Sequence, residues 1–215
     1  MTRESMTDYS LARRAMVDSQ LRPQGVTDRR VLAAMGTIER ERFVPEAARA
    51  LAYFDRPLRI GGGRAMMPPA ALGLLLSEIA PIAGEKALVV GSAIGYSAAL
   101  LKALGLDVVA LERDAALAAM AVEAGVPTDI GALVEGFGSK APYDLILLDG
   151  AVEQIPPALI EQLAPGGRLA GAIADRGVTR LVIGHAARGA LGLRTLADAD
   201  VAFLPGFERP RVFTF

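Results

Sequence analysis

The stretch from Lys86 to Asp114 constrains the fold more than any other, because it is ordered as strand, glycine turn, helix and strand. Ala87–Val90 is a continuous apolar run containing two valines, which is typical of a strand buried on both faces. The turn Gly91–Gly95 follows directly, a helix is expected over Tyr96–Leu104, and a second apolar run stops at Glu112. This βαβ unit predicts an α/β fold: a doubly wound, Rossmann-like sheet with helices on both faces.

A carboxylate at the tip of the second strand suits a nucleoside ligand. Glu112 can accept hydrogen bonds from ribose hydroxyls, while the glycines let the turn approach the rest of the ligand closely. The turn lacks the G-x-G-x-x-G pattern of dinucleotide folds, and Ala93 stands where many nucleotide folds place a glycine. The alternative is a βαβ turn with no ligand. The spacing is more similar to that of S-adenosylmethionine (SAM) methyltransferases.

Composition excludes several classes of function. The chain has 215 residues, enough for one sizeable domain, and its net charge of -1 gives no basic surface for nucleic acid. Cysteine is absent and His185 is the one histidine, so neither a metal cluster nor a thiolate nucleophile is expected. Charged residues interrupt every apolar stretch before a bilayer could be crossed, and the N-terminus does not resemble a signal peptide. We therefore expect a cytoplasmic protein that does not bind membranes.

Several motifs in order resemble protein-L-isoaspartate O-methyltransferases. The turn ending in Gly95-Tyr96 is similar to the family's G-T-G-S-G-Y, and Glu135-Gly136 stands where the family has G-D-G. The resemblance runs from about Met16 to Pro205. Its other blocks are residues 16–28, 31–35, 42–45, 52–53, 57–69, 141–149, 155–159, 162–163, 165–169 and 201–205.

This resemblance implies a SAM-dependent carboxyl O-methyltransferase acting on isoaspartyl residues of damaged proteins or peptides. It implies that Glu112 holds the ribose and that Glu135 meets the adenine amino group. The full set of implied cofactor-binding residues is Gly91, Ser92, Ala93, Gly95, Tyr96, Glu112, Arg113, Glu135 and Gly136. Neither a metal nor a particular oligomeric state is implied.

The acceptor loop departs from the family at chemical positions. Met67 stands where the family has its active-site serine, Arg64 replaces a glutamine, Arg59 replaces a proline and Pro68 replaces a second glutamine. A thioether cannot donate a hydrogen bond to a carboxylate, so we expect weak activity on simple isoaspartyl peptides. Arg64, alone or together with Arg59, is the expected replacement grip on an acceptor carboxylate.

Three alternatives stay open at this point. Both arginines are solvent-facing in the first. The second is a methyltransferase with another acceptor, since the acceptor loop is remodelled. The third is a catalytically weak homologue that binds SAM, or nothing, and has an interaction or regulatory role; Val89 in place of an acid in the first strand is compatible with it.

The chain is expected to divide into residues 1–69, N-terminal helices and an acceptor loop, packed on a methyltransferase core of residues 70–215. Thr7 and Thr27 are expected to cap the first two helices, whose charged faces are expected to be solvated. Phe54–Pro69 is expected to be a glycine-rich loop. The remaining expected elements are helices over 70–80 and 114–124, strands within 128–134 and over 141–149, 179–186 and 191–196, and a structural role for His185.

Overall fold

A seven-stranded sheet forms the centre of the computed structural model, which describes residues 8–187 and 189–209. The strand order is β5-β4-β3-β6-β7-β8-β9. All neighbouring pairs from β5 to β7 are parallel, and β8 and β9 add an antiparallel edge. The strands are β3 (Lys86–Val90), β4 (Asp107–Glu112), β5 (Thr128–Ile130), β6 (Tyr143–Val152), β7 (Leu163–Asp175), β8 (Val178–Ala187) and β9 (Ala190–Asp198).

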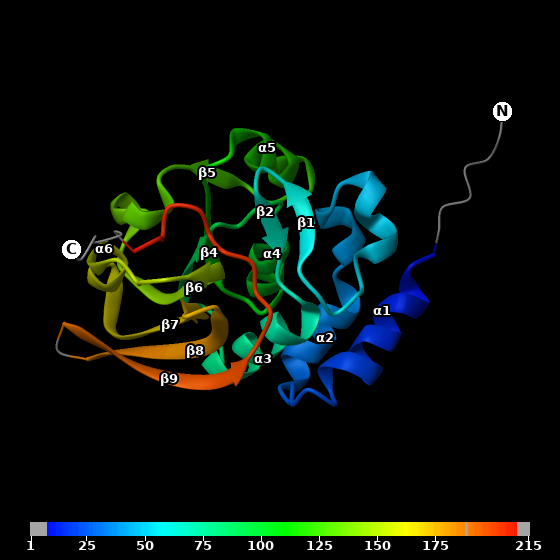
Figure 1. Ribbon diagram of the computed structural model, residues 1–215, viewed down its shortest axis with the longest axis horizontal. Coiled ribbons are helices and arrows are strands. Elements are labelled where there is room, and N and C mark those ends of the chain that lie inside the picture. Colours follow the sequence, from blue (N-terminus) through cyan, green and yellow to red (C-terminus); the bar gives the residue numbers. More distant parts are fainter. Residues whose placement is uncertain (1–7, 188, 210–215) are drawn as a thin grey trace.

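Helices cover both faces of this sheet, which confirms the doubly wound prediction (Figure 1). Along β3, Ala87 and Val89 join one buried apolar cluster, whereas Leu88 and Val90 join a second. The α-helices are α1 (Ser10–Met16), α2 (Arg29–Thr37), α3 (Pro69–Ile79), α4 (Tyr96–Ala103), α5 (Ala115–Glu123) and α6 (Pro157–Glu161). Shorter turns are η1 (Val17–Leu21), a π-helical continuation of α1, and the 3₁₀ turns η2 (Arg40–Phe43), η3 (Glu46–Leu51), η4 (Leu133–Glu135) and η5 (Gly138–Lys140).

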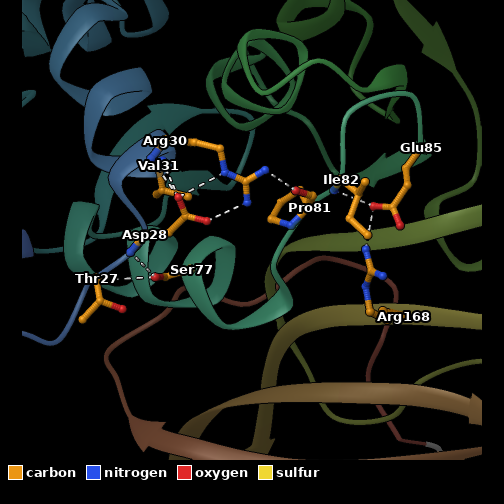
Figure 2. Close-up of polar contacts among 9 residues, drawn as sticks. All are labelled: Thr27, Asp28, Arg30, Val31, Ser77, Pro81, Ile82, Glu85 and Arg168. Atoms are coloured by element: carbon orange, nitrogen blue, oxygen red, sulfur yellow. Dashed lines mark hydrogen bonds and ion pairs between the residues drawn. The ribbon is translucent and has the colours of Figure 1, made fainter.

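Asp28, not Thr27, caps α2, because its carboxylate accepts from the amides of Arg30 and Val31. The same corner is tied to α3, since Ser77 Oγ accepts from the Asp28 amide and Arg30 donates to the Pro81 carbonyl (Figure 2). The predicted cap at Thr7 lies outside the described residues. These contacts join the N-terminal helices to the sheet domain.

Figure 2 also shows how the start of β3 is fixed. Glu85 accepts a hydrogen bond from the Ile82 amide at 2.8 Å and pairs with Arg168 of β7 at 2.6 Å. Asp114 caps α5 by accepting from the amides of Ala116 and Leu117, as predicted. The strand–turn–helix–strand unit is therefore anchored at both ends.

Phe54–Pro69 is not simply a loop. It contains an antiparallel hairpin of β1 (Leu58–Gly61) and β2 (Arg64–Met66). Leu58 and Ile60 are buried and alternate with exposed Arg59. The alternation of apolar and polar residues that is typical of a strand was therefore present within the glycine-rich segment. The hairpin tip lies against the start of α5: a Cβ on Gly62 would stand 2.4 Å from Asp114 Oδ2.

The N-terminal charged residues are not all solvated, contrary to expectation. Arg40 is fully buried, and Glu41 is buried with partners in Arg13 and Tyr53. His185 is also placed differently, because it is exposed on β8. Within the part of the chain that is described, no helix is both long and apolar enough to cross a bilayer.

Candidate active site

The floor of the candidate site is the turn between β3 and α4. Gly91, Ala93 and Gly95 all have positive φ, at 75°, 53° and 97°. The amides of Gly91 and Ser92 both donate to the carbonyl of Leu111 in β4. Ala93 therefore keeps a glycine-like conformation at a cost of roughly 1–2 kcal/mol.

Glu112, at the end of β4, is fully buried beside this turn. Its Oε2 accepts from the Ala93 amide at 2.8 Å, and its Oε1 accepts from the amides of Arg113 and Asp114 at 2.8 and 3.2 Å. This arrangement holds the Glu112 carboxyl group where a nucleoside's ribose is expected. A role for Glu112 in holding a ribose stays a prediction.

Arg64 occupies the space directly over that floor. Its Nη1 donates to Glu112 Oε2 at 2.8 Å, and its Nη2 donates to the Gly91 carbonyl at 2.7 Å and the Asp149 carbonyl at 3.4 Å. The Arg64 side chain is 1% exposed and that of Glu112 is 0% exposed. Arg64 thus points inward, but toward the predicted ribose position, whereas Arg59 is exposed.

A second group of polar side chains surrounds a small cavity next to the turn. The cavity is about 10 Å³ in volume, and Met67 is one of the residues that line it. It is also lined by Arg40, Ser92, Tyr96 and Asp149. One polar atom of each of these four, Nη1, Oγ, OH and Oδ1 respectively, has no hydrogen-bond partner among the described residues. A cavity of this volume admits about one water molecule.

Arg40 and Asp149 belong to this cavity and were not predicted as site residues. Arg40 lies 4.7 Å from the centroid of the Tyr96 ring and donates to the carbonyls of Ala52 and Met67 at 2.7 and 2.6 Å. Burial lowers the pKa of Arg40 and raises that of Tyr96. Local sequence does not separate buried Arg40 from Arg42, whose side chain is 62% exposed.

Asp149 offered a clearer signal, because it stands toward the carboxyl end of a parallel strand, where α/β proteins place their ligands. Burial raises its pKa to about 6, against the lowering effects of a hydrogen bond from Ser97 and of the Arg64 and Arg40 charges. Ser97 Oγ donates to Asp149 Oδ2 at 2.7 Å. The acid therefore stands at the boundary between the cavity and Arg64.

The remaining predicted residues lie farther out. The side chain of Arg113 is exposed, although its amide contacts Glu112. Glu135 is exposed and contributes its backbone carbonyl to Gln162, while Gly136 is buried against the Gln162 side chain with φ of 64°. A role for Glu135 at an adenine ring stays a prediction.

Arg64 and Leu204 lie against the floor of the candidate site at Gly91. A Cβ on Gly91 would already stand 2.9 and 3.1 Å from the two terminal nitrogens of Arg64 and 2.7 Å from Leu204. The guanidinium of Arg64 therefore occupies the position on Glu112 at which the sequence predicts a ribose.

Similarity to known proteins extends over nearly the whole chain. Residues 12–205 match the model of the family "Protein-L-isoaspartate(D-aspartate) O-methyltransferase (PCMT)". A protein-L-isoaspartate O-methyltransferase of Koribacter versatilis is 40% identical over 209 residues, covering 93% of this chain and 92% of the relative. Protein-L-isoaspartate O-methyltransferase 2 of an Anaeromyxobacter species is 38% identical over 200 residues, covering 90% and 82%.

Solved structures agree on the fold. A protein-L-isoaspartate O-methyltransferase superposes with a TM-score of 0.78 at 21% identity, covering 90% of this chain and 66% of the other. A Plasmodium falciparum protein assigned to the same group, in complex with S-adenosyl-L-homocysteine, gives 0.74 at 19% identity, covering 87% and 95%. The chain belongs to the protein-L-isoaspartate O-methyltransferase family of SAM-dependent methyltransferases.

Proposed function

We propose that this chain methylates the carboxylate of isoaspartyl residues in damaged proteins, using SAM, as part of protein repair in the cytoplasm. The observation that carries the proposal is identity of about 40% with isoaspartyl methyltransferases along almost the full length of both chains. The turn Gly91–Gly95 and the buried carboxylate of Glu112 support it, because they supply the floor on which such a cofactor is oriented.

The chemistry asks little of this chain's side chains. When bound, the cofactor supplies an activated methyl group, and the acceptor carboxylate is already ionised near neutral pH. The protein's contribution is to orient the two groups and exclude water, and no general base is needed. A site with buried Arg40 and Tyr96, and with no histidine lining its cavity among the described residues, is compatible with that task.

Of the predicted acceptor residues, Met67 is the one that borders the cavity, and it is 2% exposed. Its thioether gives the acceptor carboxylate no hydrogen-bond donor. Arg59 is exposed on the hairpin, and its proposed contact with the acceptor requires a substrate approaching from that side. We therefore propose slow turnover on short peptides.

The test is transfer of a radiolabelled methyl group from SAM to an isoaspartyl peptide, with the aspartyl peptide of the same sequence as control. We expect slow, isoaspartyl-dependent incorporation that is released by alkali, as a methyl ester is. We expect Met67→Ser, which restores a hydroxyl donor, to raise the rate by about tenfold or more. Equal labelling of both peptides, or label that resists alkali, would contradict carboxyl transfer to isoaspartate.

A second candidate function is a catalytically weak homologue with an interaction or regulatory role. The observation that favours it is the filled cofactor site: Arg64 pairs with Glu112 in place of a ligand. This candidate predicts no label on either peptide, in wild type and in Met67→Ser alike.

A further inference from the structure

We propose that Arg64 is an internal competitor of the cofactor: its guanidinium occupies the ribose subsite on Glu112, and the cofactor binds only when Arg64 leaves. The inference rests on the proposed function, because the competing ligand is the cofactor of that reaction. It makes Arg64 the residue that determines cofactor affinity.

The hydrogen-bonding capacity of Glu112 carries the first step. Each carboxylate oxygen accepts about two hydrogen bonds. Oε2 already accepts from Arg64 and Ala93, and Oε1 accepts from Arg113 and Asp114. Ribose hydroxyls are donors as well, so they have to replace the guanidinium rather than join it.

The second step is steric. The two terminal nitrogens of Arg64 lie 2.9 and 3.1 Å from the point where a Cβ on Gly91 would stand. Nη2 also donates a hydrogen bond to the Gly91 carbonyl. A ligand lying on the turn would overlap the guanidinium. Competition therefore concerns the same volume as well as the same carboxylate.

The third step is that release of Arg64 leaves a satisfied carboxylate behind. Glu112 would keep its three backbone donors from Ala93, Arg113 and Asp114. The β1–β2 hairpin that carries Arg64 turns through Gly61, Gly62 and Gly63, all exposed and all with positive φ. Glycine tolerates changes of φ at low steric cost, so the hairpin has a hinge beside Arg64.

The charge of Arg64 contributes to its competition with the ligand, because departure of the guanidinium breaks a buried ion pair with Glu112. Both partners are buried, and two unlike charges attract more strongly there than in water. The glutamine that the family resemblance places at this position is neutral and cannot form the ion pair. Arg64→Gln is therefore the variant that weakens the competitor while restoring the family residue.

The experiment is calorimetric titration with S-adenosyl-L-homocysteine, which binds but transfers no methyl group. Wild type, Arg64→Gln and the control Arg56→Gln are compared; Arg56 is exposed and lies just before the hairpin, so the control removes the same charge. We expect Arg64→Gln to bind about tenfold tighter or more, and the control to stay within about twofold of wild type. Equal or weaker binding by folded Arg64→Gln, or binding by neither, would overturn the inference.

Should Arg64→Gln fail to fold by circular dichroism, Arg64→Lys takes its place. A lysine keeps the charge but loses the fork that contacts Glu112 and Gly91 together. It should bind the ligand more tightly than wild type, and equal or weaker binding would contradict the competition. Amide exchange at residues 58–66 of wild type, read with saturating ligand, should become faster as the hairpin is displaced; added protection there would count against the inference.

Peptide methylation separates this inference from the proposed function. Tighter ligand binding by Arg64→Gln without methylation of isoaspartyl peptides would support the competitor and contradict the function. Methylation by a wild type that binds ligand as tightly as Arg64→Gln would support the function and contradict the competitor.

Discussion

The floor and the lid of the site differ in how they are built. The floor, Gly91–Gly95 with Glu112, lies within one βαβ unit, whereas the lid, the β1–β2 hairpin, reaches it from a distant part of the sequence. Arg64 contacts Glu112, which is 48 positions later in the sequence, and the carbonyl of Asp149, which is 85 positions later. The proposed cofactor floor is thus local in the sequence, whereas the Arg64 contact that we propose competes with the cofactor is long-range.

The largest expected effect comes from breaking the contact between the two regions at the floor. Glu112→Ala leaves the buried guanidinium of Arg64 without its carboxylate and three amides without their acceptor. We expect the free energy of unfolding to fall by about 3–5 kcal/mol in urea denaturation. The control Glu135→Ala removes an exposed acid and should change it by less than about 0.5 kcal/mol. Similar decreases in the free energy of unfolding in the two variants would mean that the Arg64–Glu112 pair does not stabilise the packing of the hairpin on the turn.

The next effect concerns Asp149 and is pH-dependent. Its pKa is raised from 3.8 to about 6, so the folded protein keeps a proton that the unfolded chain has lost between those values. Stability from this group is therefore present below about pH 4 and is lost as the pH rises toward 6. As the pH rises through this range, the free energy of unfolding of Asp149→Asn should increase relative to that of wild type by up to about 3 kcal/mol. Urea denaturation of both proteins at pH 4, 5, 6 and 7 measures the difference. A difference independent of pH would contradict the raised pKa.

A smaller effect is expected where the lid touches α5. Gly62→Ala places a Cβ against the capping carboxylate of Asp114, at a backbone with φ of 58°. We expect a loss of about 1–2 kcal/mol in the unfolding free energy. Gly63→Ala is the matched control, because it has φ of 70° but no described atom within 4 Å of the new Cβ. Equal losses would assign the effect to backbone conformation alone.

The smallest effect is expected at Arg59, the exposed arginine of the hairpin, and buried Arg64 provides the contrast. Arg59→Ala removes an exposed side chain and should change the unfolding free energy by less than about 0.5 kcal/mol. Arg64→Ala removes the buried partner of Glu112 and should cost about 2 kcal/mol or more. Thermal or urea unfolding of both variants side by side measures the contrast, and equal values would remove the distinction drawn between these two positions.

Local patterns were enough to predict much of the fold. The apolar run Ala87–Val90, the cap at Asp114 and the edge strands around Gly189 are each specified by neighbouring residues, and each is confirmed. The hairpin was missed because glycines and prolines around Leu58 and Ile60 have the composition of a loop.

Long-range partners could not be predicted in the same way. An arginine in a glycine-rich segment has one local pattern whether it faces water or pairs with a carboxylate 48 positions later, as Arg64 does. Arg40 and Arg42 share a short turn, yet the former is buried and the latter is exposed. Local sequence thus predicted the turn and the strand that ends at Glu112, whereas the contact between Arg64 and Glu112 required the structure.

Crystal structures of the wild-type protein, grown without ligand and again with S-adenosyl-L-homocysteine, test the central claim most directly. We predict that without ligand Arg64 Nη1 lies near 2.8 Å from Glu112 Oε2. With ligand, the ribose hydroxyls should take that position and the guanidinium should have left it. An open pocket with Arg64 in solvent before ligand is added, or a bound ligand beside an unmoved Arg64–Glu112 pair, would contradict the account.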